Sequence, residues 1–229
     1  MIAQTLLGAG IAAFAGLLAL TTGSNPTHSG NVPYETDLHW MRKSIDVMPP
    51  CHFNAYGSVI VNASSNELLC SGYNSQLEIG DPTEHGEINA IRNCVDKYTK
   101  LGWTPAQISE IWPQSWIYTT AEPCPMCGST ILQSGFKRVV YGTSSPTLLS
   151  LGWTEYLVTV RTTWLAKAAS LQKGFGNGRP ITQVVGPLGD VETNPRLAWQ
   201  FDEKVECPQG CRRDGEHVCR PSAWGVLLK

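Results

Sequence analysis

His85-Gly86-Glu87 and Glu122-Pro123-Cys124-Pro125-Met126-Cys127 are the two stretches that decide how this 229-residue chain folds. Cysteines three positions apart lie on one face of a helix, so Cys124 and Cys127 can reach the same metal ion. The two prolines favour a helix start, because a residue in the first turn has no intrahelical use for its N–H. Negative charge is favoured at that end of a helix, which lowers thiol pKa values and promotes binding as thiolates.

His85 is the third candidate metal ligand. Asp81-Pro82-Thr83-Glu84 is typical of a capped helix entry, and His85 follows it directly. Three protein ligands leave one tetrahedral position for water, which is typical of a catalytic zinc site. Glu87 is placed to take a proton from that water and to return it to the reacting group. We therefore expect one catalytic zinc ion per chain, with Glu87 as the proton carrier.

Each half of this pattern has an ordinary explanation when it stands alone. H-x-E occurs often by chance, and C-x-x-C in a secreted protein is as readily a disulfide or redox pair as a metal half-site. Both stretches follow helix-start signals, however, and they occur in a fixed order. H-x-E followed by P-C-x-x-C is the signature of zinc-dependent nucleobase deaminases, so the combination favours a shared metal site.

The chain from about Asp37 to Thr143 also resembles the cytidine deaminase-like superfamily outside the metal motif. It is most similar to the branch that holds bacterial tRNA adenosine deaminases, guanine deaminases and yeast-type cytosine deaminase. The other matching stretches are Leu38-His39-Trp40-Met41-Arg42, Tyr56-Gly57-Ser58-Val59-Ile60-Val61, Gly72-Tyr73-Asn74, Asp81-Pro82-Thr83 and Arg138-Val139-Val140-Tyr141-Gly142.

The resemblance implies a role for each site residue. His85, Cys124 and Cys127 are expected to bind zinc, Glu87 to carry protons, and Asn74 to contact the ring or sugar of the substrate. Glu122 is expected in the substrate site as well, either facing the substrate amine or holding the loop through hydrogen bonds. His52 precedes a strand near the expected pocket, and we interpret it as a surface or capping histidine in preference to a substrate contact.

The activity that the resemblance implies is hydrolytic deamination of a free nucleobase or nucleoside, with release of ammonia. Pro-Cys-Pro-Met-Cys and the residues from Glu87 to Arg92 resemble guanine deaminases, which slightly favours a purine such as guanine or adenine over cytosine. His-Gly-Glu resembles yeast cytosine deaminase equally. The alternatives are a secreted, non-catalytic zinc-binding interaction protein and a tRNA adenosine deaminase. A homo-oligomer is implied by the resemblance alone.

The charge distribution argues against a nucleic-acid substrate. Residues 31–160 contain seven Lys or Arg and twelve Asp or Glu, within a chain of net charge −2. A protein that holds a phosphate backbone normally carries a basic stripe. We therefore expect a small-molecule nucleobase or nucleoside as partner, and no nucleic acid.

The ends of the chain predict appendages to one domain. Leu6 to Leu20 is an uncharged run suited to a signal-peptide core and short for a membrane span, with a signal anchor as the alternative. We expect a signal peptide over residues 1–23, a linker over 24–33, a zinc deaminase domain over 34–190 and a Cys-containing extension over 191–229. The protein is then secreted or resident in the secretory-pathway lumen, without a membrane segment after signal removal.

Eight cysteines fit this location. Six remain outside the zinc pair, an even number that predicts disulfides of undetermined pairing in an oxidising compartment: Cys51, Cys70, Cys94, Cys207, Cys211 and Cys219. A second metal site formed by Cys207, Cys211, His217 and Cys219 is the disfavoured alternative. Asn62-Ala63-Ser64 is a glycosylation sequon in an expected turn between strands.

Hydrophobic periodicity predicts strands alternating with helices. Strands are expected at 55–61, 67–73, 115–119, 138–141 and 181–185, and helices at 35–47, 84–98, 124–134 and within 155–171. The pattern indicates an α/β fold, a three-layer α/β/α sandwich with a mixed five-stranded sheet. Ligands bind beyond the strand ends in such sheets, where the His85 and Cys124 helices begin.

Two segments are longer or more aromatic than the resemblance explains. Residues 100–114 form a long connection that could be a lid, although we favour ordinary packing of Trp103 and Trp112 at the sheet edge. Residues 143–164 contain Trp153, Tyr156 and Trp164, which could stack on a base, form a subunit interface or belong to the core.

Overall fold

A computed structural model describes residues 32–153, 160–171, 182–213 and 219–221 of the chain. The expected signal peptide, nearly all of the expected linker, Tyr156 and His217 lie outside these residues. Within the described part, no helix has the length and apolar character needed to cross a membrane.

The centre of the molecule is a five-stranded mixed sheet with the order β2-β1-β3-β4-β5. β1 pairs antiparallel with both β2 and β3, whereas β3, β4 and β5 run parallel. The expected sheet is therefore confirmed. Its strands are β1 (Gly57–Asn62), β2 (Leu68–Tyr73), β3 (Ser115–Ala121), β4 (Arg138–Thr143) and β5 (Gln183–Val185).

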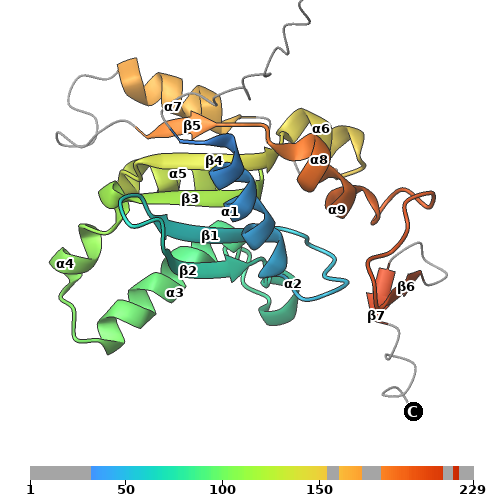
Figure 1. Cartoon of the computed structure of the whole chain (residues 1–229), viewed down its shortest axis with the longest axis horizontal. Helices are drawn as coiled ribbons and strands as arrows, with labels where there is room; N and C mark the ends of the chain where they lie inside the picture. Colours follow the sequence, from blue (N-terminus) through green and yellow to red (C-terminus); the bar gives the residue numbers. More distant parts are fainter. Residues whose placement is uncertain (1–31, 154–159, 172–181, 214–218, 222–229) are drawn as a thin grey trace, which may run out of the picture.

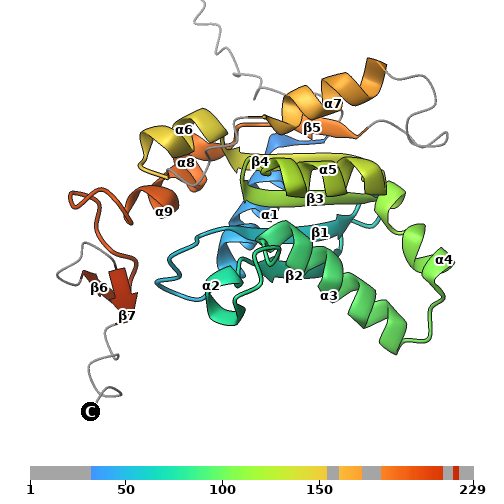
Figure 2. The ribbon, with the colours of Figure 1, turned by 180° about the vertical axis from the view of Figure 1, so that it is seen from behind.

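Helices cover both faces of this sheet. α1 and α8 lie against one face, and α3, α5 and α7 lie against the other (Figures 1 and 2), which confirms the three-layer sandwich. A two-stranded hairpin stands apart from the sheet near the C-terminus (Figure 1). The other elements are α1 (Tyr34–Asp46), α2 (Gln76–Ile79), α3 (Gly86–Lys100), α4 (Pro105–Ser109), η1 (Trp112–Gln114), α5 (Pro125–Ser134), α6 (Ser145–Ser150), α7 (Thr162–Leu171), α8 (Gly189–Glu192), α9 (Asn194–Ala198), β6 (Cys211–Arg213) and β7 (Cys219–Pro221).

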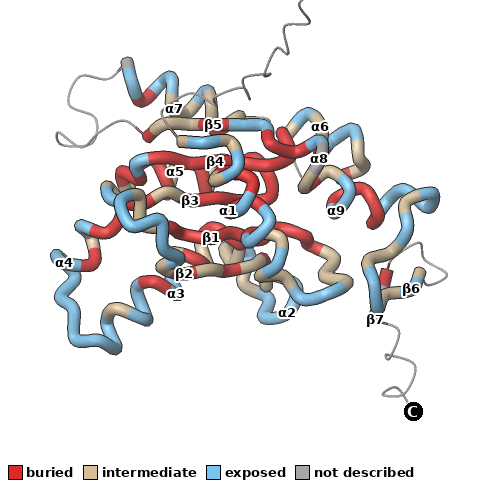
Figure 3. The backbone as a smooth tube through the Cα atoms, in the orientation of Figure 1, coloured by how far each residue is buried: buried red, intermediate tan, exposed pale blue. Residues whose placement is uncertain are grey.

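Alternation along the central strands gives each face its own core. Ile60 and Ile117 belong to the apolar cluster shared with α3 and α5, whereas the adjacent Val59 and Tyr118 belong to the cluster shared with α1. A strand with helices on both sides buries every side chain, and β1, β3 and β4 are buried along almost their whole length (Figure 3). This rigid centre positions the helix ends that form the site.

The close approach of α3 to β1 requires a glycine at position 86. A Cβ at that position would lie 2.5 Å from the carbonyl oxygen of Tyr56, closer than non-bonded atoms can approach. The glycine between His85 and Glu87 therefore lets the first turn of α3 rest directly on the backbone entering β1. The sequence motif contains this glycine for packing as well as for spacing.

Two of the four tryptophans of the two unusual segments belong to the core, and Trp164 is exposed. Trp112 is buried and its ring lies 5.4 Å from that of Phe136, whereas Trp103 is half exposed and packs on Tyr98 at 4.6 Å. Trp153 is buried, and its indole N–H donates a hydrogen bond to the Leu197 carbonyl. Ordinary packing is thus confirmed for Trp112, and the core interpretation holds for Trp153.

The cysteines outside the metal motif form three disulfides. Cys70 pairs with Cys94, joining β2 to α3; Cys51 pairs with Cys211; and Cys207 pairs with Cys219. Three cysteines of the alternative second metal site are thereby committed to disulfides. The disulfide prediction is borne out, and the structure supplies the pairing that the spacing alone left open.

The region expected to be a separate extension packs closely on the domain. Leu197 in the short helix α9 is buried, as are Trp199 and Gln200 directly after that helix. The boundary at residue 190 stays a prediction, but residues 193–200 contribute to the core of the domain. The sequon stays a prediction as well; Asn62 ends β1 in the expected turn, where its side-chain oxygen accepts hydrogen bonds from the backbone of Ser64 and Ser65.

Candidate metal centre and active site

The cysteine motif starts helix α5 as the sequence predicts. Cys124 is the N-cap residue, Pro125 occupies the first helical position, and Cys127 follows one turn later. Cys127 is buried and Cys124 is partly exposed, and neither forms a disulfide. Both sulfur atoms therefore remain available at the positive end of a helix dipole.

His85 stands at the N-cap of α3, one residue before the first helical position. The preceding loop is fixed by Asp81, whose carboxylate accepts hydrogen bonds from the backbone N–H and the hydroxyl of Thr83, at 2.8 and 2.7 Å. Arg92, from the next turns of α3, forms ion pairs with both Asp81 and Glu84. The entry to α3 is thus held by side chains on both sides of the histidine.

The ligand atoms of His85, Cys124 and Cys127 converge. All three lie within 4.8 Å of one another, and the Nδ1 atom of His85 is 3.5 Å from the Cys124 sulfur and 3.6 Å from the Cys127 sulfur. Tetrahedral zinc with Zn–N near 2.05 Å and Zn–S near 2.3 Å separates such ligand atoms by about 3.6 Å. The three side chains therefore fit one Zn²⁺ ion, with one coordination position left for water.

The two thiols influence each other strongly. The hydrogen bond from Cys127, with His85 nearby, lowers the pKa of Cys124 to about 4. The same hydrogen bond, together with burial, raises the pKa of Cys127. One sulfur is thus already suited to bind as a thiolate, and both are deprotonated when they coordinate Zn²⁺.

Glu87 lies in the first turn of α3, almost completely buried at 5% exposure. Burial raises the pKa of its carboxyl group, and the charge of the Cys124 thiolate raises it further, while a hydrogen bond with Cys127 acts in the opposite direction. A buried carboxyl group beside three metal ligands is the arrangement needed to exchange protons with a water on the open coordination position.

Residues 34–143 match the sequence profile of the family described as the cytidine and deoxycytidylate deaminase zinc-binding region. This stretch contains the whole metal centre. Over these residues the chain is similar to the cytidine deaminase-like superfamily. Zinc is accordingly the cofactor that the His85, Cys124 and Cys127 group fits.

The relatives that this chain matches differ in what they are named for. A probable cytosine deaminase of Schizosaccharomyces pombe is 28% identical over 51% of this chain and 66% of its own length. A tRNA-specific adenosine deaminase of Haemophilus influenzae is 36% identical over 38% of this chain and 45% of its own length. These matches thus span between about half and two thirds of the relatives.

Solved structures support the deaminase fold over a longer part of the chain. A guanine deaminase from Nitrosomonas europaea aligns with a TM-score of 0.52 and 19% identity, covering 85% of this chain and 98% of that one. Since the family profile ends at residue 143, this structural match extends the shared fold beyond the zinc-binding region. At this identity it establishes the fold and nothing finer.

Asn74 lies directly after β2 and is buried, with 3% of its surface exposed. Its side-chain oxygen accepts hydrogen bonds from the Gln76 backbone N–H at 3.1 Å and from Asn54 at 3.4 Å. The side-chain nitrogen has no hydrogen-bond partner among the described residues. Asn74 is thus held in one orientation with a donor left over, as a residue that contacts a ligand requires.

His52 is not a free surface residue, because both of its ring nitrogens contact other residues. Its Nε2 donates a hydrogen bond to the Asn74 carbonyl oxygen at 2.5 Å, and its Nδ1 lies 3.6 Å from Glu78. His52 therefore contacts the backbone of Asn74 and helps to hold that residue in position. This contact joins positions 22 residues apart, so no local sequence pattern predicts it.

Glu122 is fully buried and its carboxylate is occupied by the protein. It accepts two hydrogen bonds of 3.1 Å from the guanidinium of Arg161 and one of 3.0 Å from the Ser145 backbone. Thr162 adds a hydrogen bond of 2.8 Å to the Pro123 carbonyl. These contacts favour the loop-holding role of Glu122 over contact with the substrate amine.

Sequence reasoning missed Arg161 and Thr162. Both lie 39 positions from their partners in the cysteine loop, at the start of α7, and they fix the segment that carries Cys124. An Arg-Thr pair at the start of a helix has no distinctive sequence pattern, so it could not be predicted. The contacts of Arg161 and Thr162 with the cysteine loop, called the clamp below, are seen only in the folded structure.

Proposed function

We propose that this protein is a hydrolytic deaminase of a free nucleobase or nucleoside. The observation that supports the proposal most directly is the convergence of His85, Cys124 and Cys127 at zinc-ligand distances, with the buried carboxyl group of Glu87 beside them. A site built only to stabilise the fold has no use for a buried carboxyl group next to an open coordination position.

When bound, Zn²⁺ supplies a water whose pKa falls to about 7, so that a nucleophile is available at neutral pH. Glu87 accepts the proton of that water and delivers it to the ring nitrogen beside the amine-bearing carbon. It then carries the second proton of the same water, released as the carbonyl forms, to the amino group, which leaves as ammonia while a carbon–oxygen double bond replaces the bond to the amine nitrogen. Water and the aminated ring are thus converted to a carbonyl compound and ammonia.

Asn74 orients the ring in this proposal. Because its oxygen is already engaged by Gln76 and Asn54, the side-chain nitrogen is the group that faces an acceptor on the substrate. A ring carbonyl or an unprotonated ring nitrogen meets that requirement. Among such compounds we place purines such as guanine and adenine ahead of cytosine, on the resemblance of the cysteine motif to guanine deaminases.

A tRNA substrate is the second candidate, since tRNA-specific adenosine deaminases are among the relatives. The balance of seven basic and twelve acidic residues between positions 31 and 160 speaks against it. A tRNA-binding enzyme also predicts an affinity that falls steeply as salt increases. Binding of labelled tRNA at low and high salt separates this candidate from a small-molecule deaminase.

The decisive test is ammonia release from guanine, adenine, cytosine and their nucleosides, with the zinc content of the same sample measured. Turnover of one compound that is lost in Glu87→Ala names the substrate and supports the mechanism. Full zinc occupancy without turnover of any compound would reject this substrate class and favour a non-catalytic zinc-binding protein. Sedimentation of the same sample tests the homo-oligomer that we also propose from the resemblance.

We further propose that the protein acts in an oxidising compartment, secreted or within the secretory pathway. The three disulfides support this location, because such bonds are rare in proteins kept in a reducing cytosol. Intact mass under denaturing, non-reducing conditions, after alkylation of free thiols, should show only Cys124 and Cys127 modified in protein from a secretory host. Six additional modified cysteines would reject the proposal.

A further inference from the structure

A short loop between α1 and β1 holds Asn74 in position through hydrogen bonds. This loop, residues 51–54, supplies the His52 hydrogen bond of 2.5 Å to the Asn74 carbonyl and the Asn54 hydrogen bond of 3.4 Å to the Asn74 side-chain oxygen. The backbone N–H of Asn74 in turn donates to the Tyr56 carbonyl at 2.8 Å, just beyond the loop. The orientation of Asn74 therefore depends on the position of this loop.

The same loop is held on its other side by the C-terminal segment, residues 193–213. Cys51 forms a disulfide with Cys211, and the Gln200 side-chain nitrogen donates a hydrogen bond of 2.7 Å to the Phe53 carbonyl. The ring of Phe201 meets that of Phe53 edge-on, with 6.1 Å between centroids. Figure 1 shows the loop reaching out towards the β6–β7 hairpin that carries Cys211.

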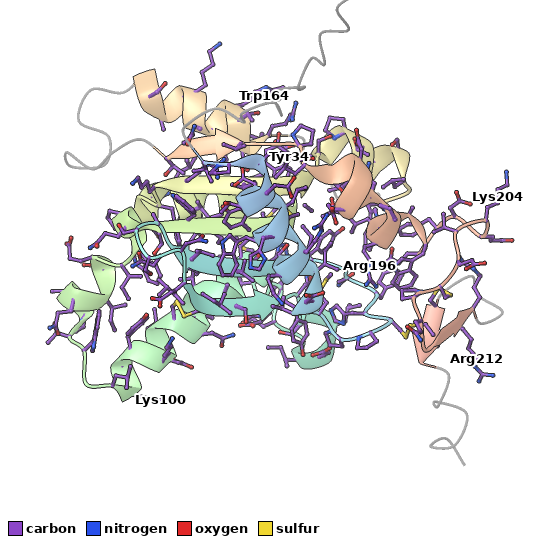
Figure 4. All side chains as sticks on the ribbon, in the orientation of Figure 1. Tyr34, Lys100, Trp164, Arg196, Lys204 and Arg212 are labelled. Carbon is purple, nitrogen blue, oxygen red and sulfur yellow. A yellow bond between two sulfur atoms is a disulfide. The ribbon has the colours of Figure 1, made fainter. Side chains whose placement is uncertain are left out.

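Two features indicate that this attachment fixes the loop. Cys51 has a φ of +64°, a left-handed conformation that is strained for a residue other than glycine and persists only when its surroundings impose it. The C-terminal segment also has an anchor of its own, because Leu197, Trp199 and Gln200 are buried. Its exposed side chains Lys204 and Arg212 point away from the rest of the molecule (Figure 4), so its contacts with the domain come from the inner face.

We propose that the C-terminal segment is a positioning element of the substrate site: through the Cys51–Cys211 disulfide and Gln200 it fixes loop 51–54, which orients Asn74. The inference rests on the proposed function for the role of Asn74 at the substrate. His52, Asn54 and Gln200 are positioning residues in this arrangement, since they act on the substrate only through Asn74. Opening the disulfide releases Cys51 from its left-handed conformation and makes the loop that contacts Asn74 more mobile. The contacts that hold the zinc ligands are not changed.

The test compares three variants with the wild-type protein. Cys51→Ser/Cys211→Ser removes the cross-link, and Gln200→Ala removes the second attachment while all disulfides remain. Cys207→Ser/Cys219→Ser is the matched control, because it removes a disulfide that joins the same segment to β7 and includes no residue of the loop. Hydrogen–deuterium exchange, zinc content, KM and kcat are measured for each.

We expect amide exchange in residues 52–56 and 74–76 to accelerate about tenfold in the first two variants, with α3 and α5 unchanged. Zinc content should stay at one ion per chain. KM for the best substrate should rise about tenfold in both variants with kcat altered by less than about twofold, since binding is weakened and the proton carrier is untouched. The control should resemble wild type in each measurement.

Exchange at residues 74–76 that stays at the wild-type rate in both loop variants would overturn the proposal, as would an equal effect in the control. If Cys51→Ser/Cys211→Ser fails to fold, Gln200→Ala alone decides by the same measurements. The exchange experiment needs no substrate, so it tests the coupling even if the wild-type protein deaminates nothing in the panel. Faster exchange with unchanged KM in an active enzyme would reject the role in the substrate site.

Discussion

Asp37 of α1 and Arg138 of β4 form a two-pronged ion pair in the interior of the sandwich, with hydrogen bonds of 2.5 and 2.7 Å. The two side chains are 0% and 1% exposed, and the Tyr118 hydroxyl also donates to Asp37 at 2.9 Å. This pair joins the helix layer to the sheet on the face opposite the metal ligands. Because the pair is buried, loss of one partner should lower the free energy of unfolding more than loss of a partner in a surface pair does.

Removing one partner of this pair should destabilise the fold strongly. We expect Asp37→Asn to lower the free energy of unfolding by about 3–5 kcal/mol, because Arg138 is left as an uncompensated buried charge. Asp46→Asn is the matched control on the same helix, since its exposed pair with Lys43 contributes little. Urea unfolding monitored by tryptophan fluorescence measures both. Equal free energies of unfolding for the two variants would contradict the large contribution to stability that we expect from the buried pair.

Tyr118 should make the protein sensitive to alkaline pH. Burial raises the pKa of its hydroxyl, and the negative charge of Asp37 raises it further. The folded protein therefore keeps this proton while the unfolded chain releases it above pH about 10, so stability is complete below that pH and declines as pH rises. Tyr118→Phe should reduce this decline by about 1.4 kcal/mol in total between about pH 9 and pH 11, as measured by urea unfolding across that range. An unchanged slope would reject the assignment.

Glu87→Ala should lose activity and keep its metal. General acid–base catalysis contributes roughly a hundredfold to ten-thousandfold, so we expect kcat to fall by at least about a hundredfold. Zinc content should be unaffected, because His85, Cys124 and Cys127 remain. Glu110→Ala, which removes an exposed carboxylate outside the site, is the control and should retain activity. Zinc loss in Glu87→Ala would instead assign the carboxylate a role in binding the metal.

Removing zinc should lower thermal stability in addition to activity. The metal joins the first turns of α3 and α5, and a ligand present at a thousandfold excess over its Kd stabilises a fold by about 4 kcal/mol. For a protein of this size, that corresponds to a Tm lower by roughly 10 °C after chelation. Calorimetry before and after dialysis against a chelator, followed by zinc addition, measures the difference. A Tm that does not recover with zinc would indicate irreversible damage and contradict simple linkage.

Glu122 should influence zinc affinity through the loop that carries Cys124. Glu122→Gln removes the charge that pairs with Arg161, and partners that orient metal ligands typically contribute tenfold to a hundredfold in affinity. We expect the Kd for zinc to rise by about that factor in a chelator competition assay. The double variant Glu122→Met/Arg161→Met leaves no unpaired charge and should fold more stably than Glu122→Gln. Unaltered zinc affinity in Glu122→Gln would limit the clamp to a structural role.

The elements with strong local signals could be predicted from the sequence. Pro125 beside Cys124 marks the start of α5, and the Asp81 turn marks the entry to α3, because capping and proline geometry operate over a few residues. The alternation of Val59 and Ile60 between two cores likewise follows from strand geometry. These local rules were enough to give the mixed sheet and to bring the metal ligands to one end of it.

Contacts between distant positions could not be predicted in this way. Asp37 and Arg138 are 101 residues apart, and Arg161 and Glu122 are 39 apart, so their pairing depends on the finished fold. The six structural cysteines allowed fifteen connectivities as a matter of counting. The Trp153 ring was equally open between pocket, interface and core, and only its packing under Leu197 decided the question.

The Cys51–Cys211 bond closes the backbone into a covalent ring, because it joins residues 160 positions apart. Both helices that carry the metal ligands, and all five strands of the sheet, belong to that ring. A single cut by a protease anywhere within it opens the ring but leaves every fragment attached. A nicked molecule should therefore migrate as one chain on a denaturing gel and separate into pieces only after reduction. In the presence of proteases, such a ring would delay the loss of the active form after the first cleavage.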